Sequence, residues 1–530
     1  MAKTKVNKVT VEKTVSIDSY IDKYFWLVIP VLAAVYFVLS RYSTGFYQDD
    51  EIQQYVNMLD FWKNPWAILG NAAKPGYKIV MVLPALISYD FVLMFSALIA
   101  STTVFLTYKL IKLYGINYAF FGALLMAAQP TYFDLSFRCY PEIFTALLFV
   151  IFLILYRKEK FAWAALIVGY IFTVRQEIAL FAIILAFVFI RNKHYKEVLL
   201  MGVFPLVYDL LGYMMNGDIM YIYSEMRNVS AFEYKMEYPQ FYHYLQTYIF
   251  VVGPVSFVLF VQGFLSFIAE KEKMKEHFSK YYLLYILFIL VIIIHTSTML
   301  IKANPGNWRY ILHISPICAV FATMGLNNLA EARYKMQNYV ITGILIFITF
   351  VFLSKQSDGR VLLDVADYTK VFFLIAVFAV TAVIPRNSSA GYLNKVSVLL
   401  VLLAVVYLSV DFKPKVLSSE NMAVKNASEF VNSQNFDGRN FYTNHPLMKF
   451  YSADYKKDPS KFSPLNSRTL PGAPKGSIVA WETHYGYRPD PVWKCDTKLE
   501  DLVNNPDYKL LNQFASIDRR FTIFFFEKIN

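Results

Sequence analysis

The chain has 530 residues, of which 57% are hydrophobic and only 17% are charged, and its mean hydropathy is +0.39. Soluble domains typically have about 45–50% apolar and about 25% charged residues, so this composition excludes a soluble enzyme, a disordered chain and a coiled-coil or collagen-like rod. The formal charge of +12 is better explained by the Lys and Arg residues that fix membrane topology than by nucleic-acid binding. The sequence therefore predicts a polytopic α-helical membrane protein, with membrane lipids rather than nucleic acid as its surroundings.

About thirteen apolar runs can cross a bilayer as helices. They cover residues 24–42, 89–108, 116–132, 141–156, 161–174, 178–190, 197–215, 247–268, 282–301, 310–328, 338–354, 369–385 and 395–411. The run 78–88 contains a proline and is too short to cross, so we expect it at the membrane interface. Lys and Arg gather between alternate runs, which predicts a cytoplasmic N-terminus and an extracytoplasmic C-terminal tail.

The tail after the last run has the composition of a soluble domain. An amphipathic segment at 420–434 and the segment 499–505 have helical periodicity, whereas four segments have the character of strands. These strand segments are 440–444, 476–482, 508–516 and 520–528. We therefore expect three parts: a cytoplasmic segment 1–23, a transmembrane domain 24–411 with its first outer loop at 43–88, and an extracytoplasmic α/β domain 412–530.

Three consecutive acids, Asp49, Asp50 and Glu51, follow the first span by a few residues. At a membrane surface such a cluster can supply the general base that deprotonates a hydroxyl or amine, or it can hold a metal ion. The alternative is the acidic first turn of an interfacial helix, which the helix dipole favours. No His is adjacent in sequence, so Mg²⁺ or Mn²⁺ would fit these residues better than Zn²⁺.

Four cations are predicted on the same side of the membrane as the acids. They are Lys74, whose position before a proline predicts an extended backbone, and Arg138, Arg175 and Arg309, each at the outer end of an apolar run. Secondary candidates next to them are Glu142, Glu177, Tyr310 and His313, the last one turn below Arg309 on the same helix face. Any one Arg can be an interfacial residue paired with a local acid, but together they predict a pocket for an anionic group such as a phosphate.

The three cysteines, Cys139, Cys318 and Cys495, lack the spacing of a metal site. Cys139 and Cys495 can pair only if the fold brings them together on an oxidising face. We expect free structural thiols.

The order of these motifs resembles the GT-C superfamily of membrane glycosyltransferases, and most closely the group of protein O-mannosyltransferases and aminoarabinose (lipid A) transferases. The matching features are an acidic motif after the first span, a Lys-Pro-Pro type motif later in that loop, an Arg-x-x-Pro-Glu-like stretch at the fourth span and a late Arg-Tyr before a proline-containing helix. In this chain they are Asp50-Glu51, Lys74-Pro75 with Gly76 in place of the second proline, Arg138 to Glu142, and Arg309-Tyr310 with Pro316.

The resemblance implies about thirteen transmembrane helices and a periplasmic C-terminal domain, as in the aminoarabinose transferases. It implies an inverting, mannosyltransferase-like enzyme of the bacterial inner membrane that transfers a sugar from a polyprenyl-phosphate donor to a protein, lipid or glycan acceptor on the extracytoplasmic side. Asp50 would be the base with Asp49 as its rival, and Glu51 would orient the acceptor or a cation. Lys74, Arg138, Arg175 and Arg309 would bind the donor phosphate.

Some GT-C enzymes use a divalent metal and others do not, so a metal at Asp49, Asp50 and Glu51 remains open.

Two functions other than sugar transfer also remain open from the sequence. A transporter or flippase for a lipid-linked sugar would also need phosphate-binding cations, but it would carry charges near the middle of several spans. An inactive assembly subunit would use its tail and would tolerate loss of the acids.

Overall fold

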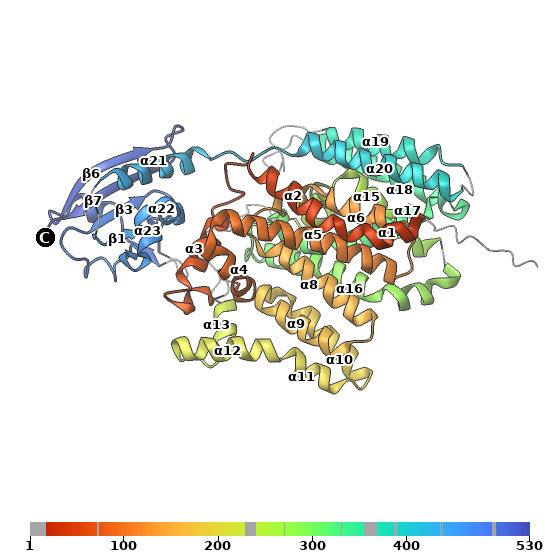
Figure 1. The fold of residues 1–530 in the computed structure, drawn as a ribbon, viewed down its shortest axis with the longest axis horizontal. Coiled ribbons are helices and arrows are strands. Elements are labelled where there is room, and N and C mark those ends of the chain that lie inside the picture. The colour runs from red at the N-terminus through yellow and green to blue at the C-terminus, as the bar shows by residue number, and fades with distance from the viewer. Residues whose placement is uncertain are drawn as a thin grey trace, which may run out of the picture.

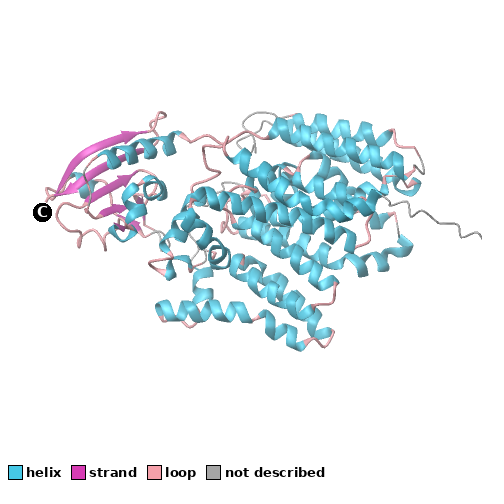
Figure 2. Cartoon of the chain, viewed as in Figure 1, coloured by secondary structure: helices cyan, strands magenta, loops and turns pink. Residues whose placement is uncertain are grey.

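The computed structural model describes residues 17–70, 74–227, 240–269, 271–329, 331–354, 368–385, 389–434, 436, 438–489 and 494–530. A long bundle of helices carries a small α/β domain at one end (Figures 1 and 2). Helix α1 (Ile17–Tyr24) lies at the opposite end of the bundle (Figure 1). Residues 1–16 of the predicted cytoplasmic segment lie outside the described residues.

Each predicted apolar run is helical for most of its length. The helices are α2 (Val28–Ser40), α5 (Tyr89–Leu113), α6 (Ala119–Ala127), α7 (Pro130–Leu135), α8 (Pro141–Arg157), α9 (Phe161–Val174), α10 (Ala179–Arg191), α11 (Tyr195–Met201), α12 (Val203–Asn216), α14 (His243–Val252), α15 (Pro254–Phe264), α16 (Met274–Leu300), α17 (Ser315–Asn328), α18 (Lys335–Ser354), α19 (Thr369–Ala382) and α20 (Ala390–Asp411). Seven helical stretches among the described residues are long and apolar enough to cross a membrane. The polytopic helical prediction is confirmed, and the shorter helices add to this set.

Several predicted spans are interrupted, which the apolar pattern alone does not indicate. The span at 247–268 breaks between α14 and α15 at Gly253, whose φ of +77° suits glycine. A Cβ there would lie 3.2 Å from Pro130 Cδ, so the break also allows a close approach to α7. The span at 310–328 begins with the 3-10 helix η6 (Trp308–Ile314), which carries Arg309.

The first outer loop contains helices α3 (Asp50–Asp60) and α4 (Pro75–Ile87), joined in part by the 3-10 helix η2 (Pro65–Ile68). Helix α4 contains most of the run 78–88 and has 13 residues, which rise about 20 Å and fall short of the bilayer core. Another short helix, α13 (Tyr221–Arg227), follows α12.

The tail forms the expected α/β domain around a five-stranded sheet of order β2-β1-β3-β7-β6. Strand β1 is parallel to β2 and β3, whereas β7 is antiparallel to β3 and β6. The predicted segments correspond to α21 (Ser419–Ser433), β1 (Phe441–Thr443), β3 (Ile478–Glu482), α24 (Glu500–Val503), β6 (Tyr508–Ala515) and β7 (Thr522–Lys528). The short elements α22 (Pro446–Tyr451), α23 (Ala453–Lys457), β2 (Phe462–Ser463), β4 (Tyr487–Arg488) and β5 (Cys495–Asp496) are too brief to give a periodic signal.

The α/β domain and helix α3 share one hydrophobic core. Ile52 and Val56 of α3 are fully buried in the same cluster as Val424 of α21 and Phe525 of β7. The ring of Phe450 lies 5.8 Å from Tyr55 and 5.2 Å from Tyr89, measured between centroids. The outer loop is thus part of the domain's core rather than a surface that the domain merely touches.

The segment that joins the bundle to the α/β domain crosses the loop just before the acids. The Gly45 amide donates to the Lys415 carbonyl at 2.8 Å, and the Lys415 amide donates to Ser43 Oγ at 2.9 Å. A Cβ on Gly45 would lie 2.1 Å from the Val416 carbonyl oxygen, so only glycine permits this crossing.

Cys139, Cys318 and Cys495 are buried, and none of them forms a disulfide with another described residue. Tyr77 donates a hydrogen bond to Cys139 Sγ at 3.6 Å. The expectation of structural thiols is confirmed.

Candidate active site

The three consecutive acids point to three different groups of residues. Asp49 is the N-cap of α3, and Asp50 and Glu51 are its first residues. Successive residues of an α-helix project about 100° apart, so the three side chains leave the start of α3 in different directions. Asp49 faces the α/β domain, Asp50 faces η6, and Glu51 faces the loop before α8.

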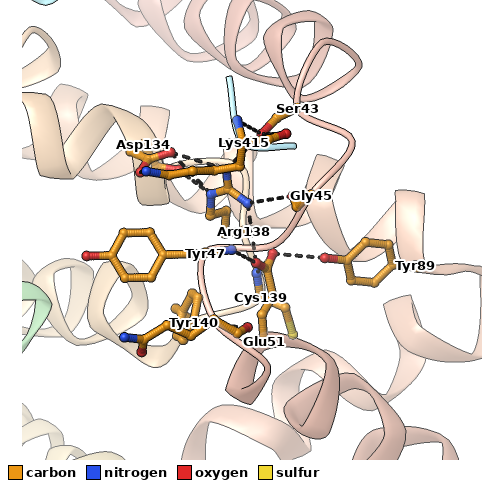
Figure 3. A network of polar contacts seen from close by, with 11 residues as sticks. Ser43, Gly45, Tyr47, Glu51, Tyr89, Asp134, Arg138, Cys139, Tyr140 and Lys415 are labelled. Carbon is orange, nitrogen blue, oxygen red and sulfur yellow. Dashed lines mark hydrogen bonds and ion pairs between the residues drawn. The ribbon is translucent and has the colours of Figure 1, made fainter. Parts of the chain in front are cut away.

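Glu51 and Arg138 form the centre of a buried polar network (Figure 3). The Glu51 side chain accepts hydrogen bonds from Tyr89 Oη at 2.8 Å, Arg138 Nη1 at 3.3 Å, and the backbone amides of Tyr47 and Cys139. Arg138 also donates to Ser43 Oγ at 2.9 Å and pairs with Asp134 at 3.2 Å. Both side chains are almost completely buried, so the guanidinium expected to bind phosphate is already surrounded by protein acceptors.

A second cluster brings together Arg175, Arg309 and Glu142 from three separate helix ends. Glu142 Oε1 lies 2.5 Å from Arg175 Nη2 and 3.8 Å from Arg309 Nε. Arg309 Nη2 donates to Asp50 Oδ2 at 2.5 Å, and Arg175 Nη1 donates to Glu177 Oε1 at 3.0 Å. These contacts form one continuous charged group, which we name the Arg175–Arg309 cluster. Its members are Asp50, Glu142, Arg175, Glu177 and Arg309.

Tyrosine rings cover the guanidinium groups of this cluster. Arg309 Cζ lies 4.5 Å from the ring centroid of Tyr140 and 5.4 Å from that of Tyr310, and Arg175 Cζ lies 5.6 Å from the Tyr310 ring. Such contacts stabilise a buried cation while leaving its N–H groups available. Tyr140 is not among the predicted site residues. Its position within the Arg138 to Glu142 stretch is the only signal in the sequence.

Several polar atoms in the Arg175–Arg309 cluster have no hydrogen-bond partner among the described residues. They include Nε and Nη1 of Arg309, Nε of Arg175 and Oε2 of Glu142. Burying an unpaired polar group is costly, and native proteins rarely leave several together without a ligand or water. The Asp50 side chain is 55% exposed, whereas that of Arg309 is only 6% exposed. An accessible carboxylate thus lies beside a buried cation with unused hydrogen-bond donors.

Lys74 lies beside this cluster, but its backbone is not extended as expected. Its φ of 55° and ψ of 64° are left-handed, which also avoids the right-handed conformation that the following proline disfavours. Such a conformation costs a non-glycine residue about 1–2 kcal/mol. Burial lowers the pKa of Lys74, and Glu177 opposes this shift. Although burial raises it, the charges of Arg175 and Lys74 hold the pKa of Glu177 well below its usual range.

Gly76 stands where the resembled Lys-Pro-Pro motif has its second proline, and the structure gives a steric reason for the glycine. A Cβ at this position would lie 2.0 Å from Thr173 Oγ1 of α9. Tyr170 Oη donates to the Gly76 carbonyl at 2.6 Å and so holds α4 against α9. A proline would not fit this contact.

His313 is not on the same face as Arg309, contrary to expectation. Helix η6 is a 3-10 helix with about three residues per turn, so a residue four positions on is rotated by about a third of a turn. The His313 ring lies 5.4 Å from Phe149 and 5.9 Å from His295 within the bundle. It is fully buried, and neither ring nitrogen has a hydrogen-bond partner among the described residues.

Asp49, the first of the three consecutive acids, contacts residues of the α/β domain that the sequence analysis did not single out. Tyr485 Oη donates to Asp49 Oδ2 at 3.3 Å. One ligand atom each from Asp49, Glu420, His445 and His484 lies within 4.8 Å of the others. In the described part of the chain this is the group suited to a metal, and it does not contain Asp50 or Glu51. The only indication of this group in the sequence is that two of the chain's seven histidines, His445 and His484, lie in the tail.

The bundle and its terminal α/β domain match the fold of solved ArnT structures over almost the whole chain, which confirms the expected polytopic helical fold with a C-terminal α/β domain. Among solved structures the chain is similar to ArnT from Cupriavidus metallidurans. The apo structure matches with a TM-score of 0.59 and 11% identity over 96% of this chain and 98% of that chain. ArnT bound to undecaprenyl phosphate matches with a TM-score of 0.56 and 10% identity over 95% and 98%. No protein-family description and no curated protein matches in sequence.

Proposed function

We propose that this protein is an inverting glycosyltransferase that uses a polyprenyl-phosphate-linked sugar and acts on the extracytoplasmic side of the membrane. The observation that carries the proposal is the Arg175–Arg309 cluster, in which buried guanidinium groups with unpartnered N–H donors lie beside the accessible carboxylate of Asp50. Such donors suit a phosphate oxygen. The acceptor is a hydroxyl or amine of a protein, a lipid or a glycan.

In the reaction, Asp50 takes the proton from the acceptor hydroxyl or amine. The acceptor oxygen or nitrogen then forms a bond to the anomeric carbon while the bond from that carbon to the phosphate oxygen breaks. The electron pair leaves with the polyprenyl phosphate, which gains one negative charge, and the configuration at carbon inverts. In this proposal Arg309, Arg175 and Lys74 stabilise that developing charge, which is the point at which fixed cations help most.

The resting contact between Asp50 and Arg309 gives the donor a way to prepare the base. Arg309 Nη2 is held by Asp50 at 2.5 Å, so a phosphate that takes this donor releases the Asp50 carboxylate. The freed carboxylate can then accept the acceptor's proton. Asp50 therefore suits the role of base better than Asp49, which faces Tyr485 and the α/β domain.

The other predicted residues take supporting roles in this proposal. Glu142 holds Arg175 and Arg309 at a fixed separation through its Oε1 atom. Glu51 and Arg138 fix the loop that carries Asp50, since their side chains are engaged with each other and with backbone groups. We propose them as positioning residues rather than as ligands of the donor.

The test is release of polyprenyl phosphate by purified protein from a panel of short-chain polyprenyl-phosphate sugars, each supplied with candidate acceptors. We expect Asp50→Asn to lower kcat by about 10²–10⁴ because it removes the general base. Arg309→Ala should lower kcat by about 10²–10³. Asp90→Asn is the matched control. Asp90 is 60% exposed and pairs with Arg41 at 2.8 Å, so its loss should leave turnover unchanged.

Equal turnover by Asp50→Asn and wild type would refute Asp50 as the base, and loss in Asp49→Asn alone would transfer that role to Asp49. Saturable binding of the lipid-linked sugars without release, with every acceptor offered, would favour the transporter. Addition of EDTA to the same assay measures whether turnover needs a divalent metal.

A further inference from the structure

Of the three consecutive acids, Asp49 is the one that contacts the α/β domain, where it meets two histidines and a glutamate. Glu420 lies at the start of α21, His445 is the N-cap of α22, and His484 lies in the turn after β3. His484 Nδ1 is 2.6 Å and His445 Nε2 is 3.3 Å from the same oxygen, Glu420 Oε1. Four segments from distant parts of the chain thus bring two imidazoles and two carboxylates to one point.

We propose that Asp49, Glu420, His445 and His484 bind a transition-metal ion, with Zn²⁺ as the best match to the ligand set. Zinc takes four nitrogen, oxygen or sulfur ligands in a tetrahedron at about 2.0–2.2 Å, which places ligand atoms about 3.3 Å apart. The four ligand atoms lie within 4.8 Å of one another, so small side-chain movements bring them to that geometry. Two carboxylates balance the charge of the ion when both imidazoles are neutral.

The donor set distinguishes this site from the metal site that the three consecutive acids could form on their own. With no imidazole available, Asp49, Asp50 and Glu51 would favour Mg²⁺ or Mn²⁺. Two imidazoles shift the preference towards Zn²⁺ and related ions. Glu51 is already engaged with Arg138, and Asp50 with Arg309, so Asp49 alone of the three is directed at the proposed ion.

Surrounding hydrogen bonds hold the ligands in place, as metal sites generally require. The buried Glu482 carboxylate accepts from the backbone amides of His484 at 2.6 Å and Tyr485 at 2.8 Å, which fixes the turn that carries His484. Tyr485 Oη donates to Asp49 Oδ2 and orients that carboxylate. These partners do not themselves ligate the ion.

Metal binding requires that the ligating nitrogens lose their protons. His445 Nδ1 accepts from the Leu447 amide at 3.2 Å, which places the proton on Nε2 when no metal is bound. On binding, one proton moves from Nε2 to Nδ1 and this helix-cap hydrogen bond is given up, while a protonated His484 would release its proton to solvent. The free energy lost with this one helix-cap hydrogen bond is small compared with the binding free energy of a structural zinc ion.

The consequence is a link between the last domain of the chain and the residue that precedes the proposed base. The ion would fix the backbone at Asp49 and thereby the start of α3, on which Asp50 lies. Because the Asp50 carboxylate itself faces Arg309, the ion would position the loop rather than take part in sugar transfer. The site does not depend on the proposed reaction.

The experiment measures metal binding by the full-length protein in detergent, without any sugar donor. Protein freed of metal by chelation is titrated with Co²⁺, whose visible absorption reports tetrahedral nitrogen and oxygen ligands, and Zn²⁺ is then added as competitor. We expect one Co²⁺ per chain, displaced by Zn²⁺, and a melting temperature that Zn²⁺ raises. His484→Gln and Asp49→Asn should each weaken binding by at least about tenfold.

His194→Gln is the control, because His194 is partly exposed and pairs only weakly with Glu197, at 3.7 Å. It should bind Co²⁺ as tightly as wild type. Size-exclusion profiles and melting temperatures without metal identify any variant that fails to fold. Wild type that binds no Co²⁺ saturably would overturn the site and leave a network of His and Glu hydrogen bonds. Undiminished binding by folded His484→Gln and Asp49→Asn would overturn it as well.

Discussion

Replacing Glu51 with Gln separates a structural from a chemical role for the acidic loop. The carboxylate has two donors on each oxygen: Tyr47 N and Arg138 Nη1 face Oε2, and Tyr89 Oη and Cys139 N face Oε1. A glutamine must turn its NH₂ group towards one of these pairs. The Tyr89 hydroxyl can reverse and accept, but a backbone amide and a guanidinium cannot.

The expected cost follows from those contacts. The variant leaves at least one buried donor opposite another donor, at about 1–3 kcal/mol, and removes the charge-assisted bond to Arg138, at about 1.5–3 kcal/mol. Asp134 still pairs with Arg138 at 3.2 Å and offsets part of this. We expect a loss of about 3 kcal/mol, at the lower end of what breaking a buried ion pair costs.

The assay is thermal unfolding in detergent, followed by intrinsic fluorescence and by recovery of monodisperse protein. A loss of this size should lower the melting temperature of a 530-residue chain by about 3 °C. Glu197→Gln is the control, since Glu197 only flanks His194 at a different part of the surface, and it should change the melting temperature by no more than about 1 °C. A Glu51→Gln protein that melts like wild type but has lost turnover would refute the structural role and return Glu51 to the reaction.

Two further predictions concern packing and pH. Gly76→Ala should destabilise the protein by about 1–3 kcal/mol, because its Cβ would lie 2.0 Å from Thr173 Oγ1. The double variant with Thr173→Ala should recover most of that loss in the same melting assay. Additive losses of the two substitutions would contradict the clash. Because Arg175 and Lys74 hold the pKa of Glu177 below its ordinary 4.5, its ionised form stabilises the fold above that pH and the benefit is lost as pH falls. Between about pH 5.5 and about pH 3.5 the melting temperature of wild type should therefore fall more than that of Glu177→Gln, and parallel curves would refute this.

The sequence predicts the helices well because each apolar run must satisfy its own backbone within the bilayer. It does not predict the break at Gly253 or the 3-10 geometry of η6, since both depend on packing against distant segments. The motifs predict that Asp50 and Arg309 belong to one pocket, and the two side chains are in contact. They do not tell which of three adjacent acids faces which partner, because that depends on the residue at which α3 begins.

The histidines of the α/β domain show a different limit. His445 and His484 are separated by 38 intervening residues and lie more than 390 residues from Asp49 in the sequence. Their meeting follows from the parallel pairing of β1 with β3 and from the docking of α3. Neither spacing nor composition indicates such an arrangement.

The shared core of α3 and the α/β domain has a consequence for how the protein is made. Ile52 and Val56 are synthesised more than 360 residues before their core partners Val424 and Phe525. Contacts this distant in sequence form late, because a very long loop must close first. The loop that bears Asp50 therefore completes its packing only after the α/β domain, as far as Phe525, has been synthesised. A chain that stops before the α/β domain would carry Asp50, Lys74 and the arginines of the candidate site, but it would lack the residues that complete the packing of α3.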